Sequence, residues 1–274
     1  MSLGSPEKQA QLQAQALWDS FDTAAYVHHN YETVLDVDAK IMSIVRAHFS
    51  DHFRDFPDLR VRGIDVGAGA NLYPSFLMLP WCHEITLLDR SSPNLDYLQR
   101  QLKEEEYGRS WDTFWHRLCR DDAYAALPGG PWPTFREIAQ VEQGNLLALA
   151  ERPRQWQLGT MFFVAESLST AYEEIPFDAA VACFMECLTP GAPFAAAFME
   201  HSQGYWVGQT FFPAHDVGKD HIRRVVGAHA YDLRIHRVGE PGEVRSGYTG
   251  MILACGFRKP GTSETAGTAA RSDL

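Results

Sequence analysis

The segment from residue 61 to residue 94 constrains the fold of this chain more than any other part of it. It reads as a short apolar strand, a turn with two glycines, an interval of helix length, and a second apolar strand that ends at Asp89. Asp89 follows Gly69 by about 20 residues, the spacing expected between a nucleotide-binding turn and the carboxylate that holds a ribose. The pair therefore predicts a site for a cofactor that contains adenosine.

Length and composition exclude several classes of protein. The chain has 274 residues, which suits one large α/β domain with additions. Its net charge of −11 argues against general nucleic-acid binding, which needs a basic surface. No apolar run is long enough to span a membrane, and the five cysteines show no Cys-x-x-Cys spacing. We therefore expect a cytoplasmic protein without a membrane span or a metal, either a monomer or a weak homodimer.

Strand and helix patterns alternate along most of the chain. Strands are expected at 61–66, 84–89, 137–143, 159–165, 193–199, 231–237 and 250–258. Helices are expected at 6–20, 34–52, from after residue 69 to near 80, 94–106, 178–188 and 217–228. This alternation predicts a doubly wound, Rossmann-like α/β fold with a mostly parallel seven-stranded sheet covered on both faces. The last two strands have no helix between them, which predicts an antiparallel edge.

Three segments lie outside this pattern. Residues 21–31 are rich in aromatic residues and histidine. Residues 107–134 form an insertion, and we expect its tryptophans to pack it on the sheet. Residues 261–274 are small and polar, which predicts disorder. The expected organisation is an N-terminal helical lid over 1–55, a binding domain over 56–260, and the disordered tail.

The residues around the two glycines discriminate between adenosine cofactors. Gly67 and Gly69 let the backbone approach a ligand closely, but the third glycine of the dinucleotide fingerprint is replaced by Leu72. Asp65, two residues before the first glycine, would repel a pyrophosphate and would suit the cationic sulfonium and ammonium groups of S-adenosylmethionine. The turn therefore favours S-adenosylmethionine over NAD.

With this turn in place, the chain resembles the class I S-adenosylmethionine-dependent methyltransferases. More narrowly, it is similar to the nicotinamide/phenylethanolamine/thioether-amine N-methyltransferase family. Four passages carry the resemblance, which is thin between 107 and 190: the aromatic segment 21–31, the loop 64–73, the strand end 88–95, and residues 200–208.

The resemblance implies a tyrosine lid over S-adenosylmethionine. Carried over by position, the cofactor contacts are Tyr26, Tyr31, Gly67, Tyr73, Asp89 and Asn94, to which the turn adds Asp65 and Gly69. Where the family has an acid near the adenine amino group, this chain has Asn145, whose amide oxygen could accept the same hydrogen bond. The amine-binding acid that some members carry before the last strand has no counterpart, so the cofactor carries over better than the acceptor.

Candidate residues for the acceptor side follow the fourth and fifth strands. Glu166 and Glu200 could bind an ammonium group or take a proton, and with Tyr31 they are the candidate catalytic residues. The structural alternative for each glutamate is a helix cap or an ion pair with an arginine. Tyr205 and Trp206 would form an aromatic wall and bind the substrate together with the two glutamates. The alternative is that both are ordinary core aromatic residues.

These features predict an enzyme that methylates a small molecule, with a nitrogen acceptor favoured because an amine or heteroaromatic nitrogen needs no base. Methylation of oxygen or carbon in an aromatic secondary metabolite is one alternative. A non-catalytic regulatory protein that binds S-adenosylmethionine or S-adenosylhomocysteine is another.

Overall fold

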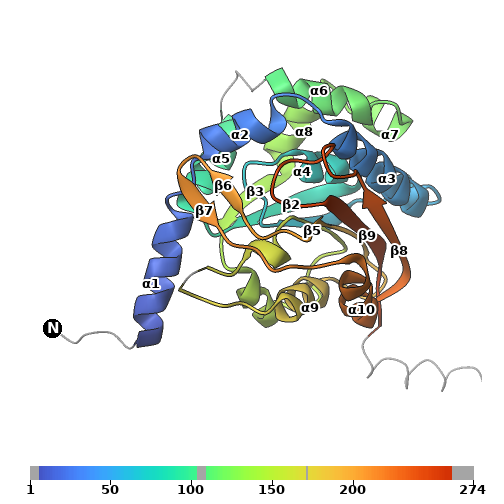
Figure 1. Ribbon diagram of the computed structural model, residues 1–274. Coiled ribbons are helices and arrows are strands. Elements are labelled where there is room, and N and C mark those ends of the chain that lie inside the picture. Colours follow the sequence, from blue (N-terminus) through green and yellow to red (C-terminus); the bar gives the residue numbers. More distant parts are fainter. Residues whose placement is uncertain (1–5, 104–108, 171, 261–274) are drawn as a thin grey trace, which may run out of the picture.

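The protein was analysed as a computed structural model, which describes residues 6–103, 109–170 and 172–260. The predicted disordered tail at 261–274 lies outside the described residues. The centre of the fold is a seven-stranded sheet with the order β3-β2-β1-β4-β5-β9-β8 (Figure 1). Its strands are β1 (Val61–Val66), β2 (Cys82–Asp89), β3 (Ala139–Gln143), β4 (Leu158–Phe162), β5 (Pro193–Glu200), β8 (Ala230–Val238) and β9 (Gly250–Arg258).

The sheet confirms the predicted fold class. Strands β1 to β5 pair in parallel, whereas β9 runs antiparallel to both β5 and β8. The predicted antiparallel pairing is therefore present at this edge, with the reversed strand β9 placed between β5 and the outermost strand β8.

The position of a ligand site follows from the strand order. Strand β1 pairs with β2 on one side and with β4 on the other, so the chain order reverses at β1. Open parallel sheets bind ligands beyond the carboxyl ends of the strands at such a switch point. The turn after β1 and the acid at the end of β2 both lie there.

Helices cover both faces of the sheet (Figure 1). One face carries α3 (Asp36–Phe53), α4 (Tyr73–Met78), α6 (Arg109–Leu118), α7 (Asp122–Ala125) and α8 (Pro131–Ile138), together with the short helix η1 (Leu79–Trp81). The other face carries η2 (Leu146–Glu151), α9 (Phe177–Cys187) and α10 (Lys219–His229). Strand β5 serves both cores, because Ala195 and Ala197 pack on the first face while Phe194 and Phe198 pack on the second. Helix α5 (Ser92–Lys103) follows β2 and packs beside β3.

The insertion packs by its tryptophans, although their ring contacts among the described residues are with residues of helices and not with the sheet on which they were expected to pack. Trp111, Trp115 and Trp132 are buried, and each ring lies within 6.4 Å of the Phe76 ring on α4. Its described part is more regular than predicted, because it forms the helices α6, α7 and α8.

The N-terminal segment meets a small hairpin above the carboxyl ends of the central strands. Helices α1 (Pro6–Trp18) and α2 (Thr23–Tyr31) lie beside the hairpin of β6 (Tyr205–Val207) and β7 (Thr210–Phe212) (Figure 1). The contact is an aromatic cluster in which Phe212 lies 5.0 Å from Trp18 and 5.4 Å from Phe21, measured between ring centroids. Helix α2 occupies the aromatic segment 21–31 and is capped by Asp22, which accepts a hydrogen bond from the N–H of Ala25. Within the described chain, no helix combines the length and apolar character needed to cross a bilayer.

Candidate active site

A cavity lies at the switch point of the sheet, and we call it the switch-point cavity. It is lined from the turn after β1, the end of β2, the start of α5, the loop after β4, and helices α1 and α2. Five of the residues predicted to contact a cofactor line it: Tyr26, Gly67, Gly69, Asp89 and Asn94. The structure therefore brings together one site from segments that are far apart in the sequence.

The two glycines of the turn are required by its geometry. Gly67 and Gly69 have φ values of 64° and 57°, a region that side chains with a Cβ rarely adopt. A Cβ on Gly67 would also lie 2.5 Å from Val164. The backbone of the turn is therefore free to approach a ligand in the cavity.

Asp89 is fixed in the floor of the cavity. Its Oδ2 accepts a hydrogen bond from the N–H of Gly69 at 2.8 Å, and its Oδ1 accepts one from the N–H of Ser91 at 2.8 Å. The Asn94 amide lies 3.4 Å from the same Oδ1. Burial raises the pKa of Asp89, and the two backbone donors lower it in part. The carboxylate is thus oriented toward the turn before any ligand binds.

Asp65 lies elsewhere than predicted. Its carboxylate accepts hydrogen bonds from the hydroxyls of Ser75 at 2.6 Å and Thr160 at 2.8 Å, beneath the turn, and it is not among the residues that line the cavity. Burial raises its pKa to about 7, and the two hydroxyls lower it in part. The side chain therefore joins β1 to α4 and β4, and a direct contact with a sulfonium or ammonium group does not follow from this geometry.

Asn145 also differs from its predicted role. Its Oδ1 accepts a hydrogen bond from the N–H of Leu147 at 3.0 Å and so caps η2. The neighbours Gly144 and Leu146 line the switch-point cavity, but Asn145 itself does not. The amide oxygen that was expected to accept from an adenine is already used within the chain.

The three predicted tyrosines form one cluster. The Tyr26 and Tyr31 hydroxyls are 3.5 Å apart, and the Tyr31 and Tyr73 rings meet edge to face at 6.2 Å. The Tyr73 hydroxyl is buried without a hydrogen bond of normal geometry among the described residues, although the Asn71 side chain is close enough to lower its pKa. Burial raises the pKa of all three phenols. They therefore remain protonated and able to donate hydrogen bonds.

A second cavity adjoins the first, and we call it the hairpin cavity because β6 and β7 form one side of it. It has a volume of about 540 Å³, within the usual range for small-molecule sites. Tyr26, Phe163 and Tyr205 line both cavities and so form the wall between them. Phe163 has a strained φ of 61°, held by a hydrogen bond from its N–H to the carbonyl of Ala197 at 2.7 Å.

The two aromatic residues predicted for the acceptor side both line the hairpin cavity. The Tyr205 ring stacks on Phe212 with centroids 5.6 Å apart, and burial raises the pKa of its phenol. Trp206 is 67% exposed and contacts Phe211 at 5.4 Å between centroids, so it is not a core residue.

Glu166 is buried behind the wall and lines neither cavity. Its Oε1 accepts a hydrogen bond from the N–H of Met199 at 2.8 Å, while its Oε2 is buried without a partner among the described residues. Burial raises the pKa of Glu166 to about 7. Because Met199 lines the hairpin cavity, the hydrogen bond from its N–H to Glu166 holds this part of the cavity lining in place.

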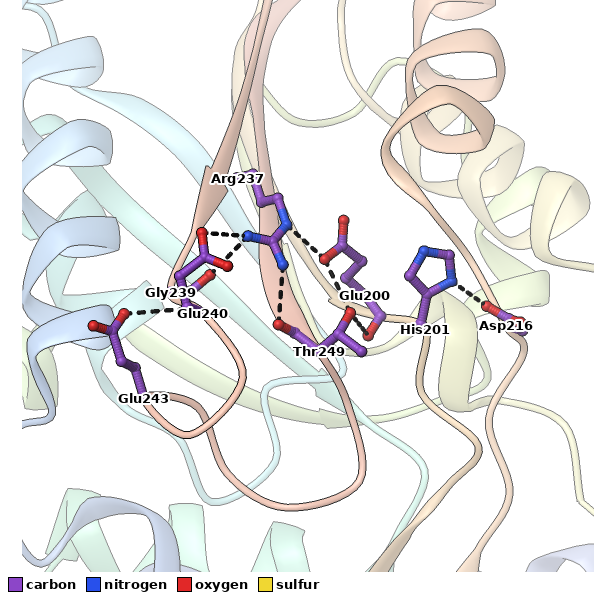
Figure 2. A network of polar contacts seen from close by, with 8 residues as sticks. All are labelled: Glu200, His201, Asp216, Arg237, Gly239, Glu240, Glu243 and Thr249. Carbon is purple, nitrogen blue, oxygen red and sulfur yellow. Dashed lines mark hydrogen bonds and ion pairs between the residues drawn. The ribbon is translucent and has the colours of Figure 1, made fainter.

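Glu200 is held in an ion pair, the structural alternative considered for it above. Its Oε2 accepts hydrogen bonds from Arg237 Nε at 2.7 Å and from the Thr249 hydroxyl at 3.0 Å (Figure 2). It lines neither cavity, and Arg237 also pairs with Glu240. Glu166 and Glu200 are therefore not brought together as a pair of carboxylates facing an acceptor.

Several residues of the two cavities were not predicted. Trp18, on α1, lines the switch-point cavity, and its Nε1 is buried without a partner in the described chain. Arg245 lines the hairpin cavity and pairs with the buried Asp38 at 2.9 Å. The position of Trp18 shortly before the lid tyrosines was an available signal, whereas Arg245 and Asp38 are 207 residues apart. In the described ranges, no group of three or more His, Cys, Asp or Glu side chains is arranged to hold a metal ion.

The strand order, the glycine turn and the acid at the end of β2 define a class I methyltransferase fold. The family profile that matches is the NNMT/PNMT/TEMT family, over residues 8–243. The chain belongs to this family and is an S-adenosylmethionine-dependent methyltransferase. No curated protein sequence matches the chain.

Two solved structures share the fold at low sequence identity. One is the 1,6-didemethyltoxoflavin-N1-methyltransferase of Burkholderia thailandensis, with bound 1,6-didemethyltoxoflavin and S-adenosylhomocysteine: 12% identity, TM-score 0.53, covering 95% of this chain and 93% of that one. The other is the magnesium protoporphyrin IX methyltransferase of Synechocystis PCC 6803, with bound S-adenosylmethionine: 11% identity, TM-score 0.52, covering 93% and 99%.

Proposed function

We propose that this methyltransferase transfers the methyl group of S-adenosylmethionine to a nitrogen atom of a small molecule. The observation that carries the proposal is the wall that the two cavities share. Tyr26, Phe163 and Tyr205 face a cofactor-type cavity on one side and a cavity of small-molecule size on the other. A donor and an acceptor bound on the two sides would meet at this wall.

The residues present fit S-adenosylmethionine in the switch-point cavity. Asp89 would accept hydrogen bonds from the ribose hydroxyls, with Asn94 beside it, and the Gly67–Gly69 turn would contact the ligand through its backbone. The buried, unpartnered Nε1 of Trp18 gives a further donor to this cavity. The family resemblance implies cofactor contacts for Tyr26, Tyr31 and Tyr73; of these, Tyr26 lines this cavity, and its hydroxyl would bind the methionine end.

A nitrogen acceptor agrees with the side chains of the hairpin cavity. When held by Asp89, Asn94 and the Gly67–Gly69 turn, S-adenosylmethionine would supply an electrophilic methyl group to the lone pair of the acceptor nitrogen. The chain contributes position and the exclusion of water, through the aromatic side chains Tyr26, Phe163 and Tyr205. No Asp or Glu is among the described lining residues and His29 is the only histidine there, so an acceptor nitrogen that needs no base makes the least demand on this cavity.

The test has two parts. Isothermal titration with S-adenosylhomocysteine should show binding, and NADH should show none. Formation of S-adenosylhomocysteine from S-adenosylmethionine should then depend on an acceptor with a free ring or amine nitrogen, and the N-methyl product should be identified by mass spectrometry. Exclusive methylation of oxygen or carbon would refute the nitrogen assignment.

Trp206→Ala gives a test of the acceptor cavity. Because Trp206 is exposed at the cavity, its removal should raise KM for the acceptor severalfold and leave the affinity for S-adenosylhomocysteine unchanged. The matched control is Tyr231→Ala, which replaces an exposed aromatic side chain on β8, away from the cavity. It should change neither value. Equal KM values for Trp206→Ala and the control would show that Trp206 does not contribute to acceptor binding.

The remaining parts of the proposal concern setting and assembly. We propose that the protein acts in the cytoplasm, which five free cysteines support, and that it does not bind nucleic acid, which the net charge of −11 supports. A monomer or weak homodimer, and a lid comprising residues 1–55 over a domain at 56–260, also remain proposals.

A further inference from the structure

The described residues that line the hairpin cavity include a cationic side chain and no carboxylate. Arg245 is the one permanently charged side chain among the described residues that line it, and His29 is the only histidine there. The other polar lining groups are uncharged, and they come mainly from tyrosines such as Tyr26, Tyr31 and Tyr248. A protonated amine in this cavity would meet a guanidinium and no carboxylate.

The Arg245 side chain is held in place by contacts within the chain. Its Nη2 donates to Asp38 Oδ2 at 2.9 Å and to the carbonyl of Asn30, and its guanidinium lies 5.6 Å from the centre of the Tyr31 ring. The side chain is 11% exposed and that of Asp38 is fully buried. The orientation of the guanidinium is therefore set before an acceptor binds.

Part of the Arg245 side chain is open to the hairpin cavity, since it is 11% exposed and lies among the residues that line the cavity. The Nε of Arg245 is buried and has no partner among the residues that the structure describes. A ligand in the cavity would not reach this buried nitrogen but would meet the exposed part of a charged group, whose N–H donors bind an anionic oxygen most strongly. Tyr248, whose pKa is raised by burial and lowered by the nearby Arg245, lies beside it as a second possible donor.

We infer that the methyl acceptor carries an anionic group, in the simplest case a carboxylate, which Arg245 binds while the acceptor nitrogen faces the shared wall. This inference rests on the proposed function of the two cavities. Asp38 offsets the charge of Arg245 at long range, so the preference comes from the short hydrogen bonds that the guanidinium donates. The net charge of −11 does not oppose it, because charges on the exposed surface are screened beyond about 8 Å.

The test measures binding of matched acceptors to the full chain loaded with S-adenosylhomocysteine, by isothermal titration. Each set shares one ring, pyridine, imidazole or indole, and differs in its substituent: carboxylate, carboxamide or aminomethyl. We expect at least one carboxylate to bind about tenfold or more tightly than both partners in its set. If no carboxylate exceeds its carboxamide in any set, the inference is wrong.

A double variant ties the preference to Arg245. Asp38→Asn with Arg245→Gln removes both members of the buried pair, so that neither charge is left alone. The carboxylate should lose its advantage in this variant while the carboxamide binds as before. The matched control is Arg62→Gln with Glu84→Gln, an ion pair at the start of β1 and β2, which should leave the preference unchanged.

Binding of S-adenosylhomocysteine separates the two levels of failure. If the unmodified chain does not bind it, the proposed function fails. If the chain binds it but prefers aminomethyl acceptors, or if the carboxylate preference persists in the double variant, only the role of Arg245 fails. If the double variant does not fold, the matched sets on the unmodified chain still decide the question.

Discussion

The carboxylate of Asp89 accepts a hydrogen bond from the backbone N–H of Gly69 at 2.8 Å. The two residues whose spacing first indicated a cofactor are thus in direct contact, and the acid fixes the turn as well as facing the cavity. A ligand that binds there meets a carboxylate whose orientation is already set by the Gly69 and Ser91 amides.

Replacement of Asp89 should therefore weaken cofactor binding. Asp89→Ala removes the acceptor proposed for the ribose hydroxyls and releases the turn, so the Kd for S-adenosylhomocysteine should rise at least about tenfold. Asp89→Asn keeps the shape but loses the charge and should have a smaller effect. Isothermal titration of both variants checks this, and an unchanged Kd for Asp89→Ala would refute the ribose role.

Trp18→Phe should weaken cofactor binding by a different route. The indole ring is replaced by another aromatic ring, but the unpartnered N–H in the switch-point cavity is lost. A neutral hydrogen bond of about 1 kcal/mol corresponds to a severalfold rise in Kd. Trp156→Phe is the control, because the Trp156 Nε1 donates to Thr86 in the core; it should lower stability and leave this Kd unchanged. Equal Kd values for both variants would exclude a Trp18 contact.

Glu200→Gln should affect stability and not catalysis. Glu200 is 6% exposed and pairs with Arg237, so its replacement leaves a partly buried guanidinium without one of its two carboxylate partners. The free energy of unfolding should fall by about 1–3 kcal/mol, measured by urea denaturation. The exposed Glu151→Gln is the control and should change it little. A large loss of kcat in a folded Glu200→Gln protein would restore the catalytic role that the sequence predicted for Glu200.

Asp65 should make the protein less stable as the pH rises. Burial raises its folded-state pKa to about 7, above about 3.9 in an unfolded chain. Between these values the folded protein holds a proton that the unfolded chain has released. The contribution of Asp65 is therefore complete below about pH 4 and declines toward about pH 7, by at most about 1.4 kcal/mol per pH unit.

Asp65→Asn isolates this effect, because Glu166, whose pKa is also raised to about 7 by burial, remains in both proteins. The difference in unfolding free energy between the two proteins should shift in favour of the variant as the pH rises from about 4 to about 7. Denaturant titrations across this interval measure it. A difference that does not vary with pH would show that Asp65 has an ordinary pKa.

The parts of the fold that the sequence predicted are those specified by local patterns. The strand, turn and acid of residues 61–89 are set by apolar runs and glycines that are adjacent in the chain, and they appear where expected. The three-residue strands β6 and β7 are too short to show a period, and they were not predicted. Helix α8 was missed because the proline- and glycine-rich residues 128–133 are typical of a loop, although Pro131 begins the helix.

The roles that the sequence misjudged depend on direction and on distant partners. The spacing of Asp65 from the glycines does not say which way its side chain points, and it points to Ser75 and Thr160. Likewise, nothing near Glu200 in the chain indicates Arg237, which is 37 residues away. Apart from Tyr26, Tyr31, Tyr205 and Trp206, the residues that line the hairpin cavity could be recognised only in the folded chain.

The wall formed by Tyr26, Phe163 and Tyr205 has a thermodynamic consequence, since each of its side chains belongs to two cavities at once. A ligand that orders these side chains in one cavity changes the affinity of the other cavity for its ligand. The two affinities are then linked reciprocally: the factor by which S-adenosylhomocysteine tightens or loosens acceptor binding must equal the factor by which the acceptor changes the binding of S-adenosylhomocysteine. Product and substrate would thereby affect each other's departure and entry through three side chains, with no movement of the sheet beneath them.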